Sequence, residues 1–347
     1  METKEILITG GLGYIGSHLA AALAEKGARS IVLVDNLVNT TRQVLYNLQI
    51  LYPATVFSFY RVDIRDRLAL EEVFKSHTIG TVVHMAALKA VGESFTRPYD
   101  YYDVNVGGTL SLMEVMEAYG CRHILFSSSA TVYGTAPSPL TDTSPTGVGI
   151  TNPYGQTKWM IEQILKDQVC ADGRWRAQVL RYFNPIGAHP SGLLGENPVK
   201  PNNLFPYMLR AAAGLSDGPL TVFGTDYPTA DGTCVRDYID ISDLVEAHIA
   251  SLRRLEHADV GPWEVYNIGT GVGVSVKECL TVFEQATGIS VPHVFGPRRR
   301  GDLPFVIATV SKKTEEVLGW KARVPLEVSC QRAWAYMEAQ REAETRL

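Results

Sequence analysis

An α/β fold built on a doubly wound parallel sheet is predicted by two features of the sequence. Short apolar runs alternate with amphipathic segments through the first half of the chain, which is the pattern of repeated strand–helix–strand units. From Asn184 onward this alternation gives way to a proline-containing stretch and then to more widely spaced helical segments. At 347 residues the chain is long enough for one large domain with a smaller lobe, or for two domains. We therefore expect a Rossmann-like parallel sheet with a smaller mixed α/β substrate lobe.

The first half of the chain supplies the predicted sheet and the helices that cover it. Continuous apolar runs are typical of buried parallel strands, and apolar residues at helical spacing mark the segments between them. The predicted strands are residues 6–9, 30–35, 56–60, 81–84, 123–127 and 178–181, and the predicted helices are residues 14–26, 67–76, 99–119 and 153–170. Because ligands of such sheets bind beyond the carboxyl ends of the strands, we expect the site there.

The second half is organised differently. Residues 184–203 are rich in proline and glycine, and loops of this length are usually functional or disordered. Helices are predicted at about 202–213, 242–255, 275–287 and 326–344, with short strands between them. We expect the sheet domain to comprise residues 1–183, with 236–267 returning to it, and the lobe to comprise mainly residues 184–235 and 268–347.

The composition argues against several classes of protein. A net charge of −5 and a pI near 5.9 give no electrostatic reason to expect nucleic acid or a membrane as a partner. No signal peptide is recognisable, and no apolar stretch reaches about 18 residues. The five cysteines lie far apart without Cys-x-x-Cys, and the eight histidines form no His-x-x-x-His, so no metal site is expected. These features predict a cytoplasmic protein with reduced cysteines.

A glycine-rich turn follows the first predicted strand and opens the first predicted helix. Residues 9–16 satisfy Gly-x-Gly-x-x-Gly through Gly11, Gly13 and Gly16, and Gly-x-x-Gly-x-x-Gly through Gly10, Gly13 and Gly16. Glycines permit a tight turn and let a pyrophosphate approach the helix N-terminus. Asp35 ends the second strand 19 residues after Gly16, where a carboxylate accepts ribose hydroxyls and repels a 2′-phosphate. This pattern predicts NAD rather than NADP, the alternative being an ordinary strand-ending Asp35.

Further residues are expected to bind the same cofactor. Tyr14 and Ile15 belong to the glycine turn, and Asn36 follows Asp35. Asp63 and Ile64 follow the third predicted strand, where they could contact the adenine. For Asp63 the alternative is a cap on the next helix.

Tyr154 and Lys158 lie four residues apart in a segment of helical spacing, after the Ser127-Ser128-Ser129 run. Positions i and i+4 share one helical face, and an ammonium beside a phenol favours the phenolate. Lowering a tyrosine pKa from about 10 to about 7 needs roughly 4 kcal/mol, and the positive ring of an oxidised nicotinamide can supply part of it. The spacing alone also arises by chance. With the serines and the glycine turn, it predicts a nicotinamide-dependent enzyme.

With these residues in view, the chain resembles the extended short-chain dehydrogenase/reductase family, and within it the UDP-glucose 4-epimerases (UDP-galactose 4-epimerases). Further segments carry the resemblance, in the family's order and almost from end to end of the chain. They are LKAVGES at 88–94, SSSATVYG at 127–134, RYFNP at 181–185, PNNL at 201–204, VRDY at 235–238 and PRRRGD at 297–302. This set is far more specific than the glycine turn or Tyr-x-x-x-Lys alone.

The resemblance implies a homodimeric enzyme that holds NAD tightly and interconverts UDP-glucose and UDP-galactose. The sugar would be oxidised transiently at C4, the 4-keto sugar would rotate, and the hydride would return to its other face. In this reaction Tyr154 would take the O4 proton, Lys158 would lower the pKa of Tyr154 and hold the nicotinamide ribose, and Ser129 would donate to O4.

The resemblance also implies roles for residues that bind the two ligands. Ala86, Lys89 and Asn105 would line the cofactor site, and Phe183 would pack near the nicotinamide. The substrate-binding set would be Thr131 beside Ser129, with Asn184, Asn203, Phe223, Arg236, Arg299 and Asp302 holding the UDP moiety and Val306 beside the hexose. The arginines would bind its diphosphate through charge-assisted hydrogen bonds.

Three alternatives stand beside this reading. A nucleotide-sugar 4,6-dehydratase shares the fold, but in that family an Asp-Glu pair follows the serine/threonine region, where this chain has Ala130-Thr131. Another NAD-dependent nucleotide-sugar epimerase is the second alternative. A non-catalytic NAD-binding regulator is the third, and such proteins often lack the Tyr-Lys pair.

The size of the hexose pocket is expected to depend on Val306. In the epimerases, the residue four positions after the Asp of Arg-x-Gly-Asp helps to set this size, and counting from Asp302 reaches Val306. A small residue there leaves room for a 2-acetamido group, so we expect activity on UDP-GlcNAc and UDP-GalNAc as well. A register slip of one residue would place Phe305 at the wall instead.

Overall fold

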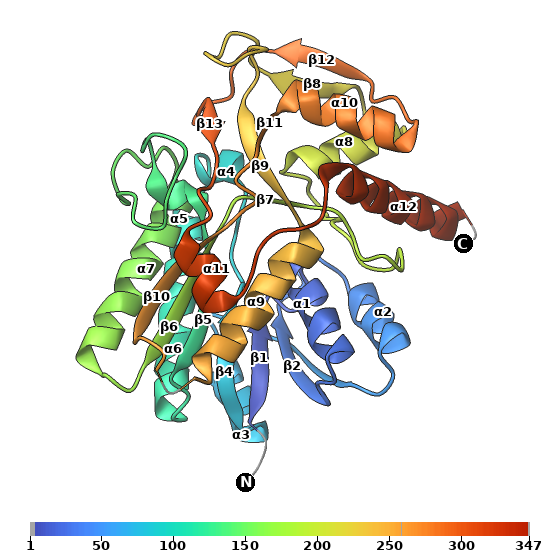
Figure 1. Ribbon diagram of the computed structural model, residues 1–347. Helices are drawn as coiled ribbons and strands as arrows, with labels where there is room; N and C mark the ends of the chain where they lie inside the picture. Colours follow the sequence, from blue (N-terminus) through green and yellow to red (C-terminus); the bar gives the residue numbers. More distant parts are fainter. Residues whose placement is uncertain (1–3, 258, 346–347) are drawn as a thin grey trace.

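The computed structural model, which describes residues 4–257 and 259–345, confirms the predicted fold class (Figure 1). Within these residues, seven parallel strands form the large sheet in the order β10-β6-β5-β4-β1-β2-β3. They are β1 (Glu5–Thr9), β2 (Ser30–Asp35), β3 (Val56–Arg61), β4 (Ile79–His84), β5 (His123–Ser129), β6 (Arg176–Tyr182) and β10 (Trp263–Ile268). The strand order reverses between β4 and β1, which is where such sheets bind their ligands.

Helices cover both faces of the large sheet. One layer consists of α1 (Tyr14–Glu25), α2 (Gln43–Leu51) and α9 (Ile241–Leu255), and the other of α3 (Arg67–Ser76), α6 (Gly108–Ala118) and α7 (Pro153–Ala171). Successive side chains of a strand point to opposite faces. Accordingly, Ile8 of β1 packs in the first layer's core and Leu7 in the second. Strands buried on both sides explain the continuous apolar runs of the sequence.

The helix predicted for residues 99–119 is confirmed as one continuous helical segment, but it contains an inserted π turn that the sequence did not predict. A short α5 (Pro98–Tyr101), preceded by α4 (Val91–Ser94), leads into a π-helical turn over Tyr102–Gly107 and then into α6. The π turn carries Asn105, whose side-chain amide bonds to both main-chain groups of Leu88 and to Thr157 of α7. An inserted π turn of this kind commonly marks a functional site. The sequence prediction also missed α2.

Among the described residues, the smaller lobe contains two small sheets and three helices. Strand β9 pairs with β7 and β13 in parallel and with β11 in antiparallel, and β8 pairs with β12. The bounds are β7 (Asn184–Ile186), β8 (Leu220–Phe223), β9 (Val235–Asp240), β11 (Gly273–Ser275), β12 (His293–Gly296) and β13 (Phe305–Val306), with α8 (Leu204–Ala212), α10 (Val276–Thr287) and α12 (Leu326–Thr345). Figure 1 shows this lobe beyond the carboxyl ends of the large-sheet strands. Phe283, Trp334 and Met208 lie in its core.

The chain returns to the large sheet after β9. Helix α9 packs against α1, and β10 pairs with β6 along its whole length. A second return follows β13, where α11 (Lys312–Leu318) packs against α9. The two parts of the molecule are therefore joined by several crossings of the chain.

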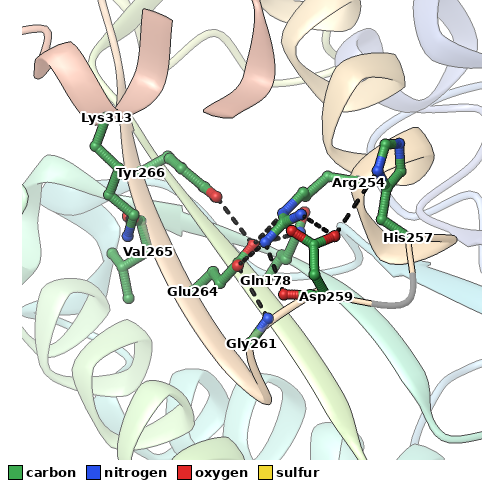
Figure 2. Close-up of polar contacts among 9 residues, drawn as sticks. All are labelled: Gln178, Arg254, His257, Asp259, Gly261, Glu264, Val265, Tyr266 and Lys313. Atoms are coloured by element: carbon green, nitrogen blue, oxygen red, sulfur yellow. Dashed lines mark hydrogen bonds and ion pairs between the residues drawn. The ribbon is translucent and has the colours of Figure 1, made fainter. Parts of the chain in front are cut away.

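Helix α9 is anchored at both ends. Near its C-terminus, Arg254 forms an ion pair of 3.0 Å with Glu264 of β10, which also accepts hydrogen bonds from Gln178 of β6 and from Tyr266 (Figure 2). Near its N-terminus, Asp243 accepts from the main chain of residues 323 and 324, at 2.8 Å each. The helix is thus held by polar contacts to the sheet and to the segment at residues 323 and 324, as well as by its apolar face.

In the part of the chain that the structure describes, no helix is both long enough and apolar enough to cross a membrane. No group of three histidine, cysteine, aspartate or glutamate side chains within the same residues could hold a metal ion.

Candidate active site

The glycine turn between β1 and α1 is packed too tightly to accept side chains. A Cβ on Gly16 would lie 2.2 Å from the carbonyl oxygen of Gly10, and a Cβ on Gly10 would lie 2.9 Å from the nitrogen of Ala86. Gly10 also has a φ of 69°, which favours glycine. No side chain caps the N-terminus of α1, so its first N–H groups are available to an anion.

This turn borders a cavity of about 450 Å³ that suits a dinucleotide. Asp35 lies in its wall beside the glycine turn, and Tyr154 and Lys158 line it as well. The predicted cofactor residues in the wall are Gly10, Gly13, Tyr14, Ile15, Gly16, Asp35, Asn36, Ile64, Ala86 and Lys89. A crowded glycine cradle, an acidic residue and the Tyr–Lys pair around one cavity fit NAD.

The carboxylate of Asp35 faces the glycine turn. It accepts from the main-chain nitrogens of Leu12 at 3.2 Å and Leu37 at 2.9 Å. Burial raises the pKa of Asp35, and these backbone hydrogen bonds oppose the rise. The side chain therefore stays at the end of β2, in the cavity wall.

Three of the predicted cofactor residues do not line the cavity. Asp63 is held by Arg65 at 2.8 Å and by Asn36 at 3.1 Å, and the hydrogen bonds from Arg65 keep its pKa well below its usual range. The capping alternative for Asp63 is wrong, because Asp66 caps α3 by accepting from the nitrogen of Ala69.

Asn105 and Phe183 are the other two. Asn105 is fully buried. Its side chain forms hydrogen bonds with Leu88 and with Thr157 of α7, and it does not line the cavity. Phe183 packs in a separate apolar cluster with Val132 and Leu140. Its neighbour Tyr182 lines the cavity instead.

Local sequence fixes the start of α7, and with it the Tyr–Lys pair. Asn152 caps the helix by accepting from the nitrogen of Gly155 at 2.8 Å, and Pro153 occupies the first helical position. Tyr154 and Lys158 therefore fall in its first turns, next to the end of β5.

Burial and one hydrogen bond determine the acidity of Tyr154. Burial raises its pKa to about 12, while a hydrogen bond with Ser129 lowers it. Ser129 Oγ accepts from the nitrogen and the hydroxyl of Thr131, at 3.2 and 3.0 Å. Because these contacts use its lone pairs, the hydroxyl hydrogen of Ser129 is free to donate to Tyr154 or to a ligand.

Lys158 is buried, and its charge is only partly compensated. Its ammonium donates to the carbonyl oxygen of Ser127 at 2.7 Å and lies 4.8 Å from the ring centre of Phe126 and 6.0 Å from that of Tyr154. Burial lowers its pKa to about 7, with a smaller opposing effect of Glu162. In this structure the burial of Tyr154, which raises its pKa, thus outweighs the lowering of that pKa expected from Lys158.

The sequence analysis missed Glu196, which joins the cofactor cavity to the smaller lobe. One carboxylate oxygen accepts from Lys89 at 2.7 Å and from Asn203, at the N-terminus of α8, at 3.0 Å. The other oxygen is buried and has no hydrogen-bond partner among the described residues. Its position in the irregular stretch 184–203 was the only signal in the sequence.

A buried ion pair behind Lys158 was also missed. Glu162 of α7 binds Arg181 of β6 at 2.6 Å and accepts from Ser128, also at 2.6 Å. Glu162 lies one helical turn after Lys158, on the same face, so the i, i+4 spacing was a usable signal.

Four of the predicted substrate residues, Phe223, Arg236, Arg299 and Asp302, form a cluster in the smaller lobe. Arg299 pairs with Asp302 at 2.8 Å, and Arg236 lies 3.8 Å from the same carboxylate. The guanidinium of Arg299 lies 5.8 Å from the ring centre of Phe223, which is 42% exposed. Two arginines around one carboxylate, with an accessible aromatic ring beside Arg299, suit a nucleoside diphosphate.

The wall predicted for the hexose pocket contains Val306. In the register of β13 and β9, Val306 is opposite Arg236, and it packs against the cluster that contains Phe183. Phe305 is 39% exposed and is not part of this cluster. Asn184 lies on β7, which pairs with the C-terminal half of β9.

The sheet, the glycine cradle and the Ser–Tyr–Lys group together define a nicotinamide-dependent enzyme of the short-chain dehydrogenase/reductase class. Residues 6–269 match the NAD dependent epimerase/dehydratase family, and the chain belongs to that family.

Named relatives agree over nearly the whole chain. UDP-glucose 4-epimerase 2 of Arabidopsis thaliana is 48% identical over 335 residues, which cover 95% of this chain and 94% of the relative. The crystal structure of UDP-glucose 4-epimerase from Bifidobacterium longum in complex with NAD+ and UDP is 42% identical, with a TM-score of 0.93 over 97% of this chain and 99% of that one. A UDP-glucose-4-epimerase from Stenotrophomonas maltophila, with bound NAD and formylated UDP-arabinopyranose, is 41% identical, with a TM-score of 0.91 over 98% and 100% of the two chains.

Proposed function

We propose that this protein interconverts UDP-glucose and UDP-galactose with NAD. The observation that carries the proposal is the placement of Tyr154 and Lys158 in the wall of a cavity that fits a dinucleotide, with Ser129 hydrogen-bonded to Tyr154. Relatives at 45% to 48% identity are named UDP-glucose 4-epimerase. The cluster of Arg236, Arg299 and Phe223 supplies contacts suited to UDP.

Each member of the catalytic group has a proposed task. Tyr154 takes the proton from the O4 hydroxyl of the sugar and later returns it. Ser129, whose oxygen is already occupied by Thr131, donates to O4. Lys158 holds its charge beside Tyr154, where a positive charge favours the phenolate. NAD, when bound, supplies the oxidation of C4 and its reversal, which removes and then restores the stereocentre.

The two ends of the substrate need different degrees of restraint. The sugar must turn over between the two half-reactions, so its contacts have to be weak, while UDP remains anchored. The charged cluster around Asp302 and the apolar wall at Val306 suit this division. In the proposed division, residues 1–183, with 236–267 returning to their domain, bind mainly NAD, and residues 184–235 and 268–347 bind mainly UDP-sugar, together with Arg236 at the start of the returning segment.

Two broader features complete the proposal. A homodimer is supported by Trp159, Met160 and Ile164 of α7, which are apolar yet only partly buried in one chain. A cytoplasmic location is supported by the five cysteines, all of which are free.

The test is to incubate the purified protein with UDP-galactose and to measure UDP-glucose without adding NAD. We expect turnover, with the bound nicotinamide unchanged at the end. A 4-keto-6-deoxy product would instead favour a dehydratase, and binding of NAD without turnover would favour a regulator.

A further inference from the structure

A buried histidine lies directly behind the cofactor cavity. His248 of α9 is fully buried, and its Nε2 is in hydrogen-bonding contact with the hydroxyl of Tyr182, at the end of β6. The two ring centres are 5.2 Å apart. The other ring nitrogen, Nδ1, is 2.8 Å from the carbonyl oxygen of Leu244, in the preceding turn of α9.

The contact with Leu244 determines which nitrogen of His248 carries hydrogen. A carbonyl oxygen can only accept, so Nδ1 must donate to it. Burial lowers the pKa of His248 to about 4, so the ring is neutral at pH 7 and Nε2 has a free lone pair. Nε2 is therefore an acceptor, and Tyr182 is the donor available to it.

Tyr182 has one hydroxyl hydrogen and two polar neighbours. Ser127 Oγ is the second, at 2.7 Å, and could accept the same hydrogen. When the hydrogen is directed to His248, the oxygen of Tyr182 can accept from Ser127 instead. Since hydroxyl hydrogens rotate to suit their network, this arrangement satisfies all three groups at once.

Ser127 connects the hydrogen-bonded pair of His248 and Tyr182 to the catalytic group. Its hydroxyl contacts Tyr182, while its carbonyl oxygen accepts from the ammonium of Lys158 at 2.7 Å. Ser127 and Tyr182 both line the cofactor cavity, as Lys158 and Tyr154 do. A continuous run of contacts therefore joins His248, behind the sheet, to Lys158, inside the site.

We propose that His248 is a positioning residue, which holds the Tyr182 hydroxyl and, through Ser127, the carbonyl group that orients the Lys158 ammonium. The role rests on the proposed function, because Lys158 acts in that reaction. His248 itself touches none of the described catalytic side chains.

The anchoring of α9 makes His248 a fixed reference point. The contacts of Asp243 precede it on the helix, and the ion pair of Arg254 with Glu264 follows it (Figure 2). Because the helix is held on both sides of residue 248, the imidazole ring has a fixed position. Its hydrogen bond therefore fixes the position of the Tyr182 hydroxyl.

Two substitutions separate the contacts of the two ring nitrogens. In His248→Gln, the side-chain oxygen can replace Nε2 as the acceptor for Tyr182. In His248→Asn, the shorter amide can replace Nδ1 but cannot reach Tyr182. We expect His248→Asn to lower kcat by about 10- to 100-fold with little change in KM for the UDP-sugar, because small displacements of catalytic groups have effects of this size. His248→Gln should stay within about threefold of the unsubstituted protein, since a preserved hydrogen bond preserves the position.

Tyr182→Phe provides the second test. It removes the hydroxyl through which His248 acts, so adding His248→Asn to it should lower kcat no further. A further loss of more than about threefold in the double variant would overturn the proposal, as would equal losses in His248→Gln and His248→Asn.

A third measurement does not depend on turnover. Nitrogen NMR of ¹⁵N-histidine-labelled protein at pH 7 should show His248 neutral, with hydrogen on Nδ1, and a ring with hydrogen on Nε2 would contradict the inference. Because the NMR result stands without any substrate, its failure is distinguishable from failure of the proposed function, which would show as absence of epimerisation in the unsubstituted protein.

Discussion

The ammonium of Lys158 and the carbonyl oxygen of Ser127 are joined by a hydrogen bond of 2.7 Å inside the protein. This contact fixes the position of a charge that burial disfavours, and it places that charge within 6.0 Å of the ring centre of Tyr154. We therefore expect the same lysine to affect both catalysis and stability.

The stability of the protein without cofactor should depend on pH through Lys158. Burial lowers its pKa from 10.5 to about 7, so between these values the unfolded chain binds more protons than the folded one. The free energy of unfolding should rise by up to about 1.4 kcal/mol for each pH unit from pH 7 toward pH 10. The stability gained in this range is lost again as the pH falls back to 7. Urea unfolding at pH 7, 8 and 9, with Lys158→Met as reference, measures it. Parallel curves for the two proteins would contradict the expectation.

Tyr154→Phe should remove nearly all epimerisation while UDP still binds. The substitution removes the proton-transfer group and leaves the arginine cluster intact, and such groups contribute about 10²- to 10⁴-fold. Tyr99→Phe is the matched control, because Tyr99 is 87% exposed. The measurements are the turnover number of each variant and its affinity for UDP by calorimetry. If Tyr154→Phe kept more than about a tenth of normal turnover, Tyr154 would not be the proton-transfer group.

The protein should prefer NAD to NADP because of Asp35. Its carboxylate lies in the cavity wall, where it would repel a 2′-phosphate. Asp35→Asn should narrow the preference by about tenfold, which corresponds to about 1.4 kcal/mol. Asp63→Asn is the control, because Asp63 does not line the cavity. Equal affinity of the unsubstituted protein for both cofactors, measured by calorimetry, would show that Asp35 does not discriminate between them.

Glu196→Gln should accelerate the release of NAD. The ion pair with Lys89 closes the cavity wall between the two parts of the molecule, and loss of one partner of such a pair acts mainly on dissociation. We expect an increase on the order of tenfold in the NAD dissociation rate. Asp226→Asn, which breaks the exposed pair with Arg298, should leave the rate unchanged. The same rate in all three proteins would exclude this role.

Val306 should admit UDP-N-acetylhexosamines to the site. It packs against the apolar cluster of Phe183, whereas Phe305 does not. The structure therefore favours Val306 over Phe305 as the residue at the hexose wall. The measurement is kcat/KM on UDP-GlcNAc and on UDP-glucose, with Val306→Tyr expected to exclude the acetamido sugar by steric overlap. A value for UDP-GlcNAc more than about 10³-fold lower and unaffected by the substitution would refute an open pocket, since that gap is roughly 4 kcal/mol.

The features that could be predicted from the sequence are local. The strands of the large sheet are continuous apolar runs because both faces are buried, and the glycine turn is recognisable because only glycine fits its contacts. The start of α7 follows from Asn152 and Pro153, so the position of the Tyr–Lys pair could be read directly.

The features that could not be predicted depend on contacts between distant segments. Tyr182 and Phe183 are adjacent, and which one faces the cavity depends on where β6 ends, because neighbouring side chains on a strand point to opposite faces. Glu196 joins Lys89 across 107 positions of the chain, and no local pattern specifies such a pair. The π turn carries Asn105, whose bonds to Leu88 and Thr157 join segments 17 and 52 positions apart, and helix propensity does not reveal such contacts.

The repeated crossing of the chain between the large sheet and the smaller lobe limits how this protein can be divided or recombined. A fragment ending at residue 183 would lack β10, α9 and α11, and would leave one edge of the sheet and part of its helical layer uncovered. The lobe likewise has no single segment that could be exchanged for another protein's. New specificities in this scaffold are therefore expected to arise by substitution of individual residues, as at Val306 of β13, and not by transfer of a whole module.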